Sequence, residues 1–322
     1  AREHGPGTPS VVVGFTPTFA ESLLRIVGPV TIDGRRYTAE NIADELEYQV
    51  EKGYYDQGIP RPQRKAIIGP LSRTIIDRIF ATPFRNWGAI VSATGTAVRE
   101  RHLLAYGKDA AIQGFLEQFD LAGRVRPLAS GDDGLLVVDA NLGALKTDPV
   151  VERSIRYAVI PDGAGGYRGT VRLRYRNTGS FTWKTTRYRT YTRVYLPTGT
   201  QLIQARGAMV RDRSDDEGPV DRGEEFGRSW FGAFLSVEPG QERSLVFEIR
   251  LAPPVAERIR RGSYVLDIQK QLGTLATPLT LDLEFGTPVE TADPPEPPAA
   301  WGNSRYSMET DLREDRQFSV QF

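Results

Sequence analysis

The regular alternation of apolar and polar residues after Ser154 constrains the fold of this chain more than any other feature. Ile155, Tyr157 and Val159 occupy every second position, and the same period returns over residues 171–175. Side chains at i, i+2 and i+4 of a β-strand share one face, so this period predicts strands with one buried face. Similar strand-like segments follow at 188–196, 207–210, 229–235, 244–251, 263–269 and 279–285. Seven or eight short strands with Gly- and Pro-containing turns predict a sandwich or barrel, and we expect an antiparallel, immunoglobulin-like β-sandwich over residues 151–287.

The first part of the chain has a helical period instead. Phe19, Leu23 and Val27 are spaced to share one helix face, and apolar residues recur at helical spacing over residues 67–79. We therefore expect an α+β protein in which residues 1–130 form a mostly helical α/β segment.

Two connecting regions complete the predicted organisation. Residues 131–150 are interpreted as a crossing segment because their second half is rich in turn residues, and residues 288–322 as a Pro-rich connector with a C-terminal strand. Residues 317–322 alternate regularly. A terminal strand of this kind completes its own sheet or pairs with a neighbouring molecule, and we favour its own sheet.

Composition excludes several classes of function. Forty-one basic and forty-one acidic residues give no net charge, so the chain lacks the long-range field that draws proteins to nucleic acid. The absence of cysteine excludes disulfides, thiolate catalysis and Cys-ligated metals, and two histidines exclude a His-rich metal site. No run of 18 apolar residues occurs.

A basic cluster is the sharpest local candidate for a binding site. Arg61, Arg64 and Lys65 lie at the start of the predicted Ile-rich helix, where two guanidinium groups and an ammonium could bind a phosphate near the helix N-terminus. The alternative is a solvated basic first turn. Helix-dipole arguments disfavour that alternative, because the helix N-terminus is itself positive.

A group of oxygen-bearing side chains is a second candidate. The group consists of Asp132, Asp133, Asp139, Asn141 and Asp148. Carboxylate and amide oxygens are the ligands that calcium prefers, although the spacing is not that of an EF-hand. Turn and cap duties are the alternative. We expect no other cofactor and no catalytic residue, and we interpret His102 as a packed or surface side chain.

Several stretches together resemble a bacterial family known as domain of unknown function number four thousand and twelve. The matching stretches are GPVTIDG at 28–34, TAENI at 38–42, ERHLLAY at 100–106, VVDANLG at 137–143, KTD at 146–148, VYLPTG at 194–199 and IQKQ at 268–271. The resemblance implies a bacterial protein facing outward from the cell, without an established activity. Members usually carry a further upstream region with a transmembrane helix. The resemblance therefore implies an anchor outside this sequence and an upstream region that could act as a separate chain.

A second resemblance covers only residues 28–65. This stretch is similar to part of the LytR-CpsA-Psr cell-envelope transferases, whose Arg-x-x-Arg-Gln element holds a lipid pyrophosphate. Arg61, Arg64 and Lys65 correspond to that element, with Lys65 in place of Gln.

Two functional hypotheses follow from the sequence. The first is a non-enzymatic extracytoplasmic protein of the cell surface that acts in envelope assembly or self-association, with the C-terminal strand as one candidate contact to a protein partner. The second is a glycopolymer transferase or polyprenyl-phosphate binder that needs the upstream region.

Overall fold

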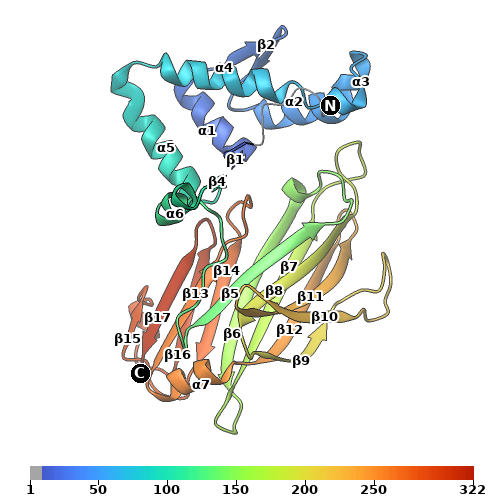
Figure 1. The fold of residues 1–322 in the computed structure, drawn as a ribbon. Coiled ribbons are helices and arrows are strands. Elements are labelled where there is room, and N and C mark those ends of the chain that lie inside the picture. The colour runs from blue at the N-terminus through green and yellow to red at the C-terminus, as the bar shows by residue number, and fades with distance from the viewer. Residues whose placement is uncertain (1–8) are drawn as a thin grey trace. The chain divides into compact units, whose positions relative to one another are not determined.

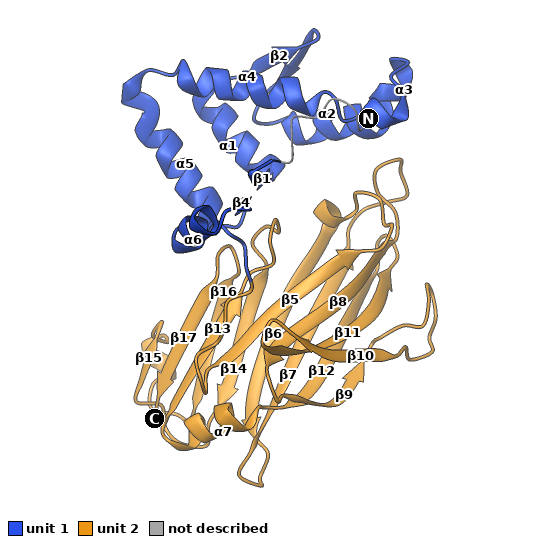
Figure 2. Ribbon diagram, viewed as in Figure 1, with its two compact units in different colours: residues 1–124 blue, residues 125–322 orange. Residues whose placement is uncertain are grey.

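The computed structural model describes residues 9–322, and the chain divides into two compact units, residues 1–124 and 125–322 (Figure 2). Strand residues outnumber helical ones, and both occur, so the chain is an α+β protein. No helix within residues 9–322 has the length and apolarity needed to cross a bilayer.

Unit 1 carries most of the helices (Figure 1). Its strands are β1 (Val11–Phe15), β2 (Val30–Ile32), β3 (Arg35–Tyr37) and β4 (Leu103–Gly107), and its α-helices are α1 (Pro17–Val27), α2 (Ile42–Tyr48), α3 (Tyr54–Asp56), α4 (Ile68–Phe80), α5 (Trp87–Arg99) and α6 (Ala110–Gln118). Strands β1 and β4 pair antiparallel, and β2 and β3 form a hairpin. Phe19, Leu23 and Leu24 of α1 are buried with Ile75 of α4 in one apolar cluster, which confirms the helical period predicted there.

Unit 2 contains two large sheets. Its strands are β5 (Asp133–Asn141), β6 (Val151–Pro161), β7 (Tyr167–Asn177), β8 (Tyr188–Pro197), β9 (Gln201–Arg206), β10 (Val220–Glu225), β11 (Arg228–Val237), β12 (Glu242–Arg250), β13 (Ser263–Gln269), β14 (Pro278–Glu284), β15 (Thr291–Asp293), β16 (Arg305–Asp311) and β17 (Arg316–Gln321), and helix α7 spans Pro253–Arg260. The first sheet has the order β10-β11-β8-β5-β13-β17-β15 and the second β16-β14-β6-β7-β12-β9.

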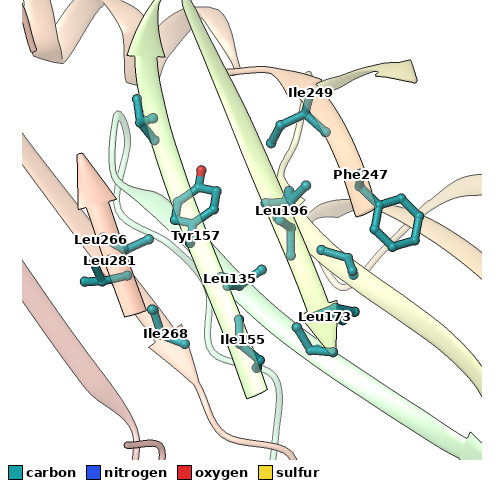
Figure 3. Close-up of a cluster of buried hydrophobic side chains, with 14 of the residues drawn as sticks. Leu135, Ile155, Tyr157, Leu173, Leu196, Phe247, Ile249, Leu266, Ile268 and Leu281 are labelled. Atoms are coloured by element: carbon teal, nitrogen blue, oxygen red, sulfur yellow. The ribbon is translucent and has the colours of Figure 1, made fainter. Parts of the chain in front are cut away.

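One hydrophobic core lies between these sheets. Leu135 of β5 and Leu266 of β13 come from the first sheet, and Ile155 of β6 and Leu281 of β14 from the second (Figure 3). All four are at most 2% exposed. The alternation that predicted strands with one buried face is therefore confirmed at β6, where Ile155, Tyr157 and Val159 all face this core.

The sequence predicted antiparallel sheets, and the structure has mixed sheets in which most strand pairs are antiparallel and two are parallel. β13 runs parallel to β5, with Leu266 opposite Asp133, and β14 runs parallel to β6, with Leu279 opposite Ile155. Parallel neighbours need a crossover connection, and long connections separate both pairs along the chain.

The predicted domain limits differ from the observed ones. The second unit begins at Val125, and residues 133–141 of the expected crossing segment form β5, which lies between β8 and β13. Residues 288–322 are not a separate connector, because β15 and β17 belong to the first sheet and β16 to the second. Only residues 142–150 cross between sheets in the expected way, leading from β5 to β6.

The C-terminal strand completes its own sheet, as we favoured. β17 has β13 on one side and β15 on the other. β13 pairs with β17 over residues 316–321, and β15 pairs with it over residues 319–321. Self-association through this strand stays a prediction.

Candidate functional site

The inner face of β5 carries two carboxylates at its ends and apolar residues between them. Alternate residues of a strand share one face, so Asp133, Leu135, Val137 and Asp139 all point toward the second sheet. Leu135 and Val137 lie in the hydrophobic core. The two carboxylates are thus placed inside the unit, and each needs polar partners there.

Asp133 is held by two tyrosines. Its Oδ2 accepts hydrogen bonds from the hydroxyl of Tyr157 on β6, at 2.7 Å, and of Tyr264 on β13, at 2.6 Å, while Oδ1 accepts from the N–H of Gly134 at 2.8 Å. Burial raises the pKa of the Asp133 carboxyl above its ordinary value, against the opposing effect of these hydrogen bonds. Burial also raises the pKa of both tyrosines, so they remain donors at neutral pH.

Asp139 is held by an arginine and two hydroxyls. It forms an ion pair with Arg153 of β6, and Oδ1 accepts from Tyr175 at 2.8 Å and from Thr192 at 2.6 Å. Arg153 also donates to Gln271 at 3.1 Å. Burial lowers the pKa of Arg153, but Asp139 and its neighbours more than offset this, so the guanidinium stays charged.

The five candidate cation ligands do not meet in one place. Asp133 and Asp139 are six residues apart on one strand, which corresponds to about 20 Å. Asp132 is paired with Arg258, and Asp148 accepts a 2.6 Å hydrogen bond from Asn141. Within residues 9–322 no group of three or more acidic or histidine side chains is arranged to hold a metal ion. The candidate cation ligands therefore do not form one site, because residues 133–141 form strand β5 and hold Asp133 and Asp139 far apart.

The candidate phosphate ligands lie before helix α4, not in its first turn. Arg61 belongs to a separate 3-10 turn, and α4 begins only at Ile68. Arg64 forms an ion pair with Glu51 at 2.7 Å, whereas Arg61 and Lys65 are exposed. A phosphate site at these residues stays a prediction.

His102 is buried, and its Nδ1 lies 3.0 Å from the hydroxyl of Thr16. This hydrogen bond joins the segment after α5 to the start of α1. The position agrees with the interpretation of His102 as a packed side chain.

The main feature that sequence reasoning missed is the exposed apolar surface of β1. Val11, Val12, Val13 and Phe15 are between 40% and 57% exposed, so both faces of this strand reach solvent. Many other large apolar side chains of unit 1 are also at least half exposed: Tyr55, Ile76, Phe80, Phe84, Val91, Tyr106, Phe115 and Phe119. A run of β-branched residues predicts a strand but does not show how many neighbours the strand has.

No strand within residues 9–322 pairs with the outer edge of β1. Among the described residues, β1 pairs only with β4. The N–H of Thr16 donates to the carbonyl of His102, and the N–H of Lys108 donates to the carbonyl of Ser10. The backbone groups of Ser10 and Thr16 therefore point toward the β4 side. Alternate residues point their N–H groups to opposite sides, so those of Val11, Val13 and Phe15 face away from β4.

Comparisons with known proteins add little beyond this geometry. No family model matches the sequence, and no curated protein matches it. A putative nutrient binding protein from Legionella pneumophila is similar over 58% of this chain and 72% of its own, with 10% identity and a TM-score of 0.36. An M1 zinc metallopeptidase from Deinococcus radiodurans is similar over 56% of this chain and 43% of its own, with 11% identity and a TM-score of 0.24. At these TM-scores neither likeness carries an argument about this chain.

Proposed function

We propose that this chain is a non-enzymatic, extracytoplasmic protein of the cell envelope that acts in assembly, and that it associates with a second copy of itself through β1. The observation that carries the proposal is the combination on one strand of an open edge and two exposed apolar faces. Exposed apolar patches rimmed by polar residues mark interaction sites on soluble proteins.

The outer edge of β1 is suited to pair with another β-strand. An open edge presents N–H and C=O groups that another strand can pair with, and natural edges are usually protected by a charge or a proline. Val11–Phe15 contains neither. Because the segment is uncharged, two copies can pair antiparallel about a two-fold axis without bringing like charges together, and the two-stranded β1–β4 sheet would become four-stranded.

The non-enzymatic part of the proposal rests on the carboxylates of unit 2. Asp133 and Asp139 use their oxygens to join the two sheets, so they serve the fold rather than a reaction. The envelope location rests on the resemblance of the sequence to the outward-facing bacterial family. Within this proposal unit 2 acts as an immunoglobulin-like spacer.

The transferase-like alternative has less support. It needs Arg61, Arg64 and Lys65 to hold a lipid pyrophosphate, and Arg64 is already paired with Glu51.

Sedimentation velocity of the full chain over a range of concentrations tests the proposal. We expect a concentration-dependent dimer for the wild type and a monomer for Val12→Lys, because two like charges would face each other near the two-fold axis. Ile203→Lys is the matched control, since Ile203 is 45% exposed on β9, an edge strand of unit 2. A wild-type monomer at every concentration, or equal effects of both variants, would contradict the proposal.

A further inference from the structure

Helices α4 and α5 of unit 1 meet at a corner that exposes large apolar side chains (Figure 1). The two helices are joined by residues 81–86. Phe80 at the end of α4 is 72% exposed, and Phe84 in the connection is 91% exposed. Ile76 and Val91, on the adjoining helical turns, are 50% and 65% exposed. We call these four side chains the apolar corner.

The apolar corner is separate from the core of unit 1. Ile75 of α4 and Ile90 of α5 are at most 7% exposed and share an apolar cluster with Leu24 of α1. Ile76 and Phe80 lie one turn apart on a different side of α4 from Ile75. Among residues 9–322, α1 therefore covers one apolar side of these helices, and a second apolar side faces solvent.

Hydrogen bonds hold the connection between the two helices. The indole N–H of Trp87 donates to the carbonyl of Thr82 at 3.2 Å, and the hydroxyl of Thr82 donates to the carbonyl of Arg78 at 2.8 Å. The rings of Phe80 and Trp87 are in contact, with 6.2 Å between their centroids. Because the connection is tied to the ends of both helices, Phe80 and Phe84 are presented to solvent by an ordered backbone.

The charges beside the apolar corner are basic. Arg73 and Arg78 of α4 and Arg85 of the connection are exposed, and residues 66–98 contain one carboxylate, Asp77. Within residues 9–322, the side chains of these three arginines form neither an ion pair nor a hydrogen bond. Arg73 lies on the same side of α4 as Ile76 and Phe80, because three and then four residues separate them.

The neighbouring elements do not reverse this basic excess. The main contacts of α4 and α5 are with α1, β2 and β4. In α1, Glu21 is paired with Arg25, and β4 has no charged residue. The hairpin of β2 and β3 has Asp33 against Arg35 and Arg36. The acidic stretch of unit 1, residues 40–56, lies on α2, α3 and the turn between them, outside these neighbours.

A basic corner with projecting aromatic side chains complements an anionic lipid surface. Helices with arginine beside exposed phenylalanine and tryptophan are typical of the membrane interface. A fluid acyl layer can receive a projecting ring such as Phe84 without a preformed pocket, whereas a protein partner would need a matching one. Arginine stems can also lie along apolar surface while their guanidinium groups stay among the headgroups.

We propose that the α4–α5 corner inserts Phe80 and Phe84 into the interfacial region of an anionic lipid bilayer, with Arg73, Arg78 and Arg85 beside the headgroups. Binding of this kind scales with the buried apolar area plus the attraction to anionic lipid. The inference uses no residue of β1 and stands independently of the proposed self-association.

Co-sedimentation of the full chain with vesicles tests this inference. One vesicle preparation contains phosphatidylcholine alone, and the other contains equal parts of phosphatidylcholine and phosphatidylglycerol. We expect the wild type to bind the mixed vesicles more strongly. The double variant Phe80→Ser/Phe84→Ser should lower the partition coefficient by about tenfold or more, since two rings lose their contact with lipid. Arg85→Gln should lower it by about fivefold on the mixed vesicles only.

Two residues of unit 2 provide matched controls. Phe226 is 63% exposed in the turn between β10 and β11, and Arg222 is exposed on β10. Phe226→Ser and Arg222→Gln should leave the partition coefficient unchanged. Phe84→Ser alone keeps the test valid if the double variant unfolds, because a ring that is 91% exposed contributes little to the fold, and it should still weaken binding.

Three results would overturn the inference. The first is absence of binding to both vesicle preparations, or equal binding to both. The second is a loss in the unit 2 controls equal to the loss in the corner variants. The third is a wild-type dimer that Phe84→Ser dissociates in the absence of any vesicle binding, which would assign the apolar corner to a contact between copies.

Discussion

Asp139 of β5 and Arg153 of β6 form an ion pair that joins the two sheets of unit 2, and their side chains are only 8% and 10% exposed. Removing two charges from water is costly, and here the cost is offset by further hydrogen bonds from Tyr175 and Thr192 to the same carboxylate. The pair therefore specifies how β6 lies across β5, because any other register would leave a buried charge without a partner.

Replacing one partner of this ion pair should lower the free energy of unfolding more than replacing both partners. We expect Arg153→Met to lower the free energy of unfolding by about 3–5 kcal/mol, since Asp139 would stay buried and unpaired. The double variant Arg153→Met/Asp139→Asn should recover part of that loss. Urea unfolding of the two single variants and the double variant measures this. A double variant that loses the full sum of the single losses would contradict a coupled pair.

The raised pKa of Asp133 predicts a specific dependence of stability on pH. The folded state keeps the proton to a higher pH than the unfolded state, whose ordinary value is 3.8. The contribution of this carboxyl to stability is thus fully present below pH 3.8 and is lost as the pH rises through the folded-state pKa.

Asp133→Asn removes this titration and leaves the other carboxyls in place. The free energy of unfolding of the variant relative to the wild type should therefore increase between pH 3.8 and neutral pH. Denaturant unfolding at several pH values measures the difference. A difference that stays constant with pH would show that Asp133 titrates alike in both states.

Two glycines with positive φ should respond differently to substitution. Gly207 has φ +84°, and a Cβ there would lie 2.0 Å from the carbonyl oxygen of Ser244. Gly143 has φ +70°, and a Cβ there would meet nothing within 4 Å. We expect Gly143→Ala to cost about 1–2 kcal/mol from backbone strain alone. Gly207→Ala should cost about 2–5 kcal/mol, because steric overlap adds to that strain. Equal losses in thermal unfolding would contradict the close approach at Ser244.

Asn177 should not tolerate a negative charge. It is fully buried, and its amide donates to the carbonyls of Thr186 and Val237, both at 3.1 Å. Asn177→Asp would place an acceptor against two acceptors, so we expect a loss of more than about 3 kcal/mol at neutral pH. Part of the loss should be recovered in acid, where a protonated carboxyl can donate one hydrogen bond. Unfolding at two pH values checks this, and a loss independent of pH would count against it.

The sequence predicted local structure better than pairing. Ile155, Tyr157 and Val159 alternate because one face of β6 is buried, and that period is visible within five residues. The parallel pairing of β13 with β5 has no such local sign, since the two strands are about 130 residues apart and the pairing depends on the whole topology. The prediction of antiparallel sheets was therefore right for most strand pairs and wrong for β5–β13 and β6–β14, which are parallel.

The partners of the candidate site residues also could not be predicted from the sequence. In the sequence Asp133 and Asp139 have the appearance of loop carboxylates near turn residues. Their partners Tyr264 and Arg153 are fixed only by the packing of the two sheets, so their structural role could not be read from spacing. The β-branched run Val11–Val13 is typical of a strand, but the exposure of Val12 depends on which strands lie beside it.

Hydrogen exchange at β1 tests the central claim, self-association through this strand, most directly. The N–H groups of Val11, Val13 and Phe15 face away from β4 and would be paired only in the complex. We predict that these three amides exchange slowly in concentrated protein and rapidly in dilute protein and in Val12→Lys. Rapid exchange at all concentrations, with Gly14 still protected by its pairing with β4, would contradict the account.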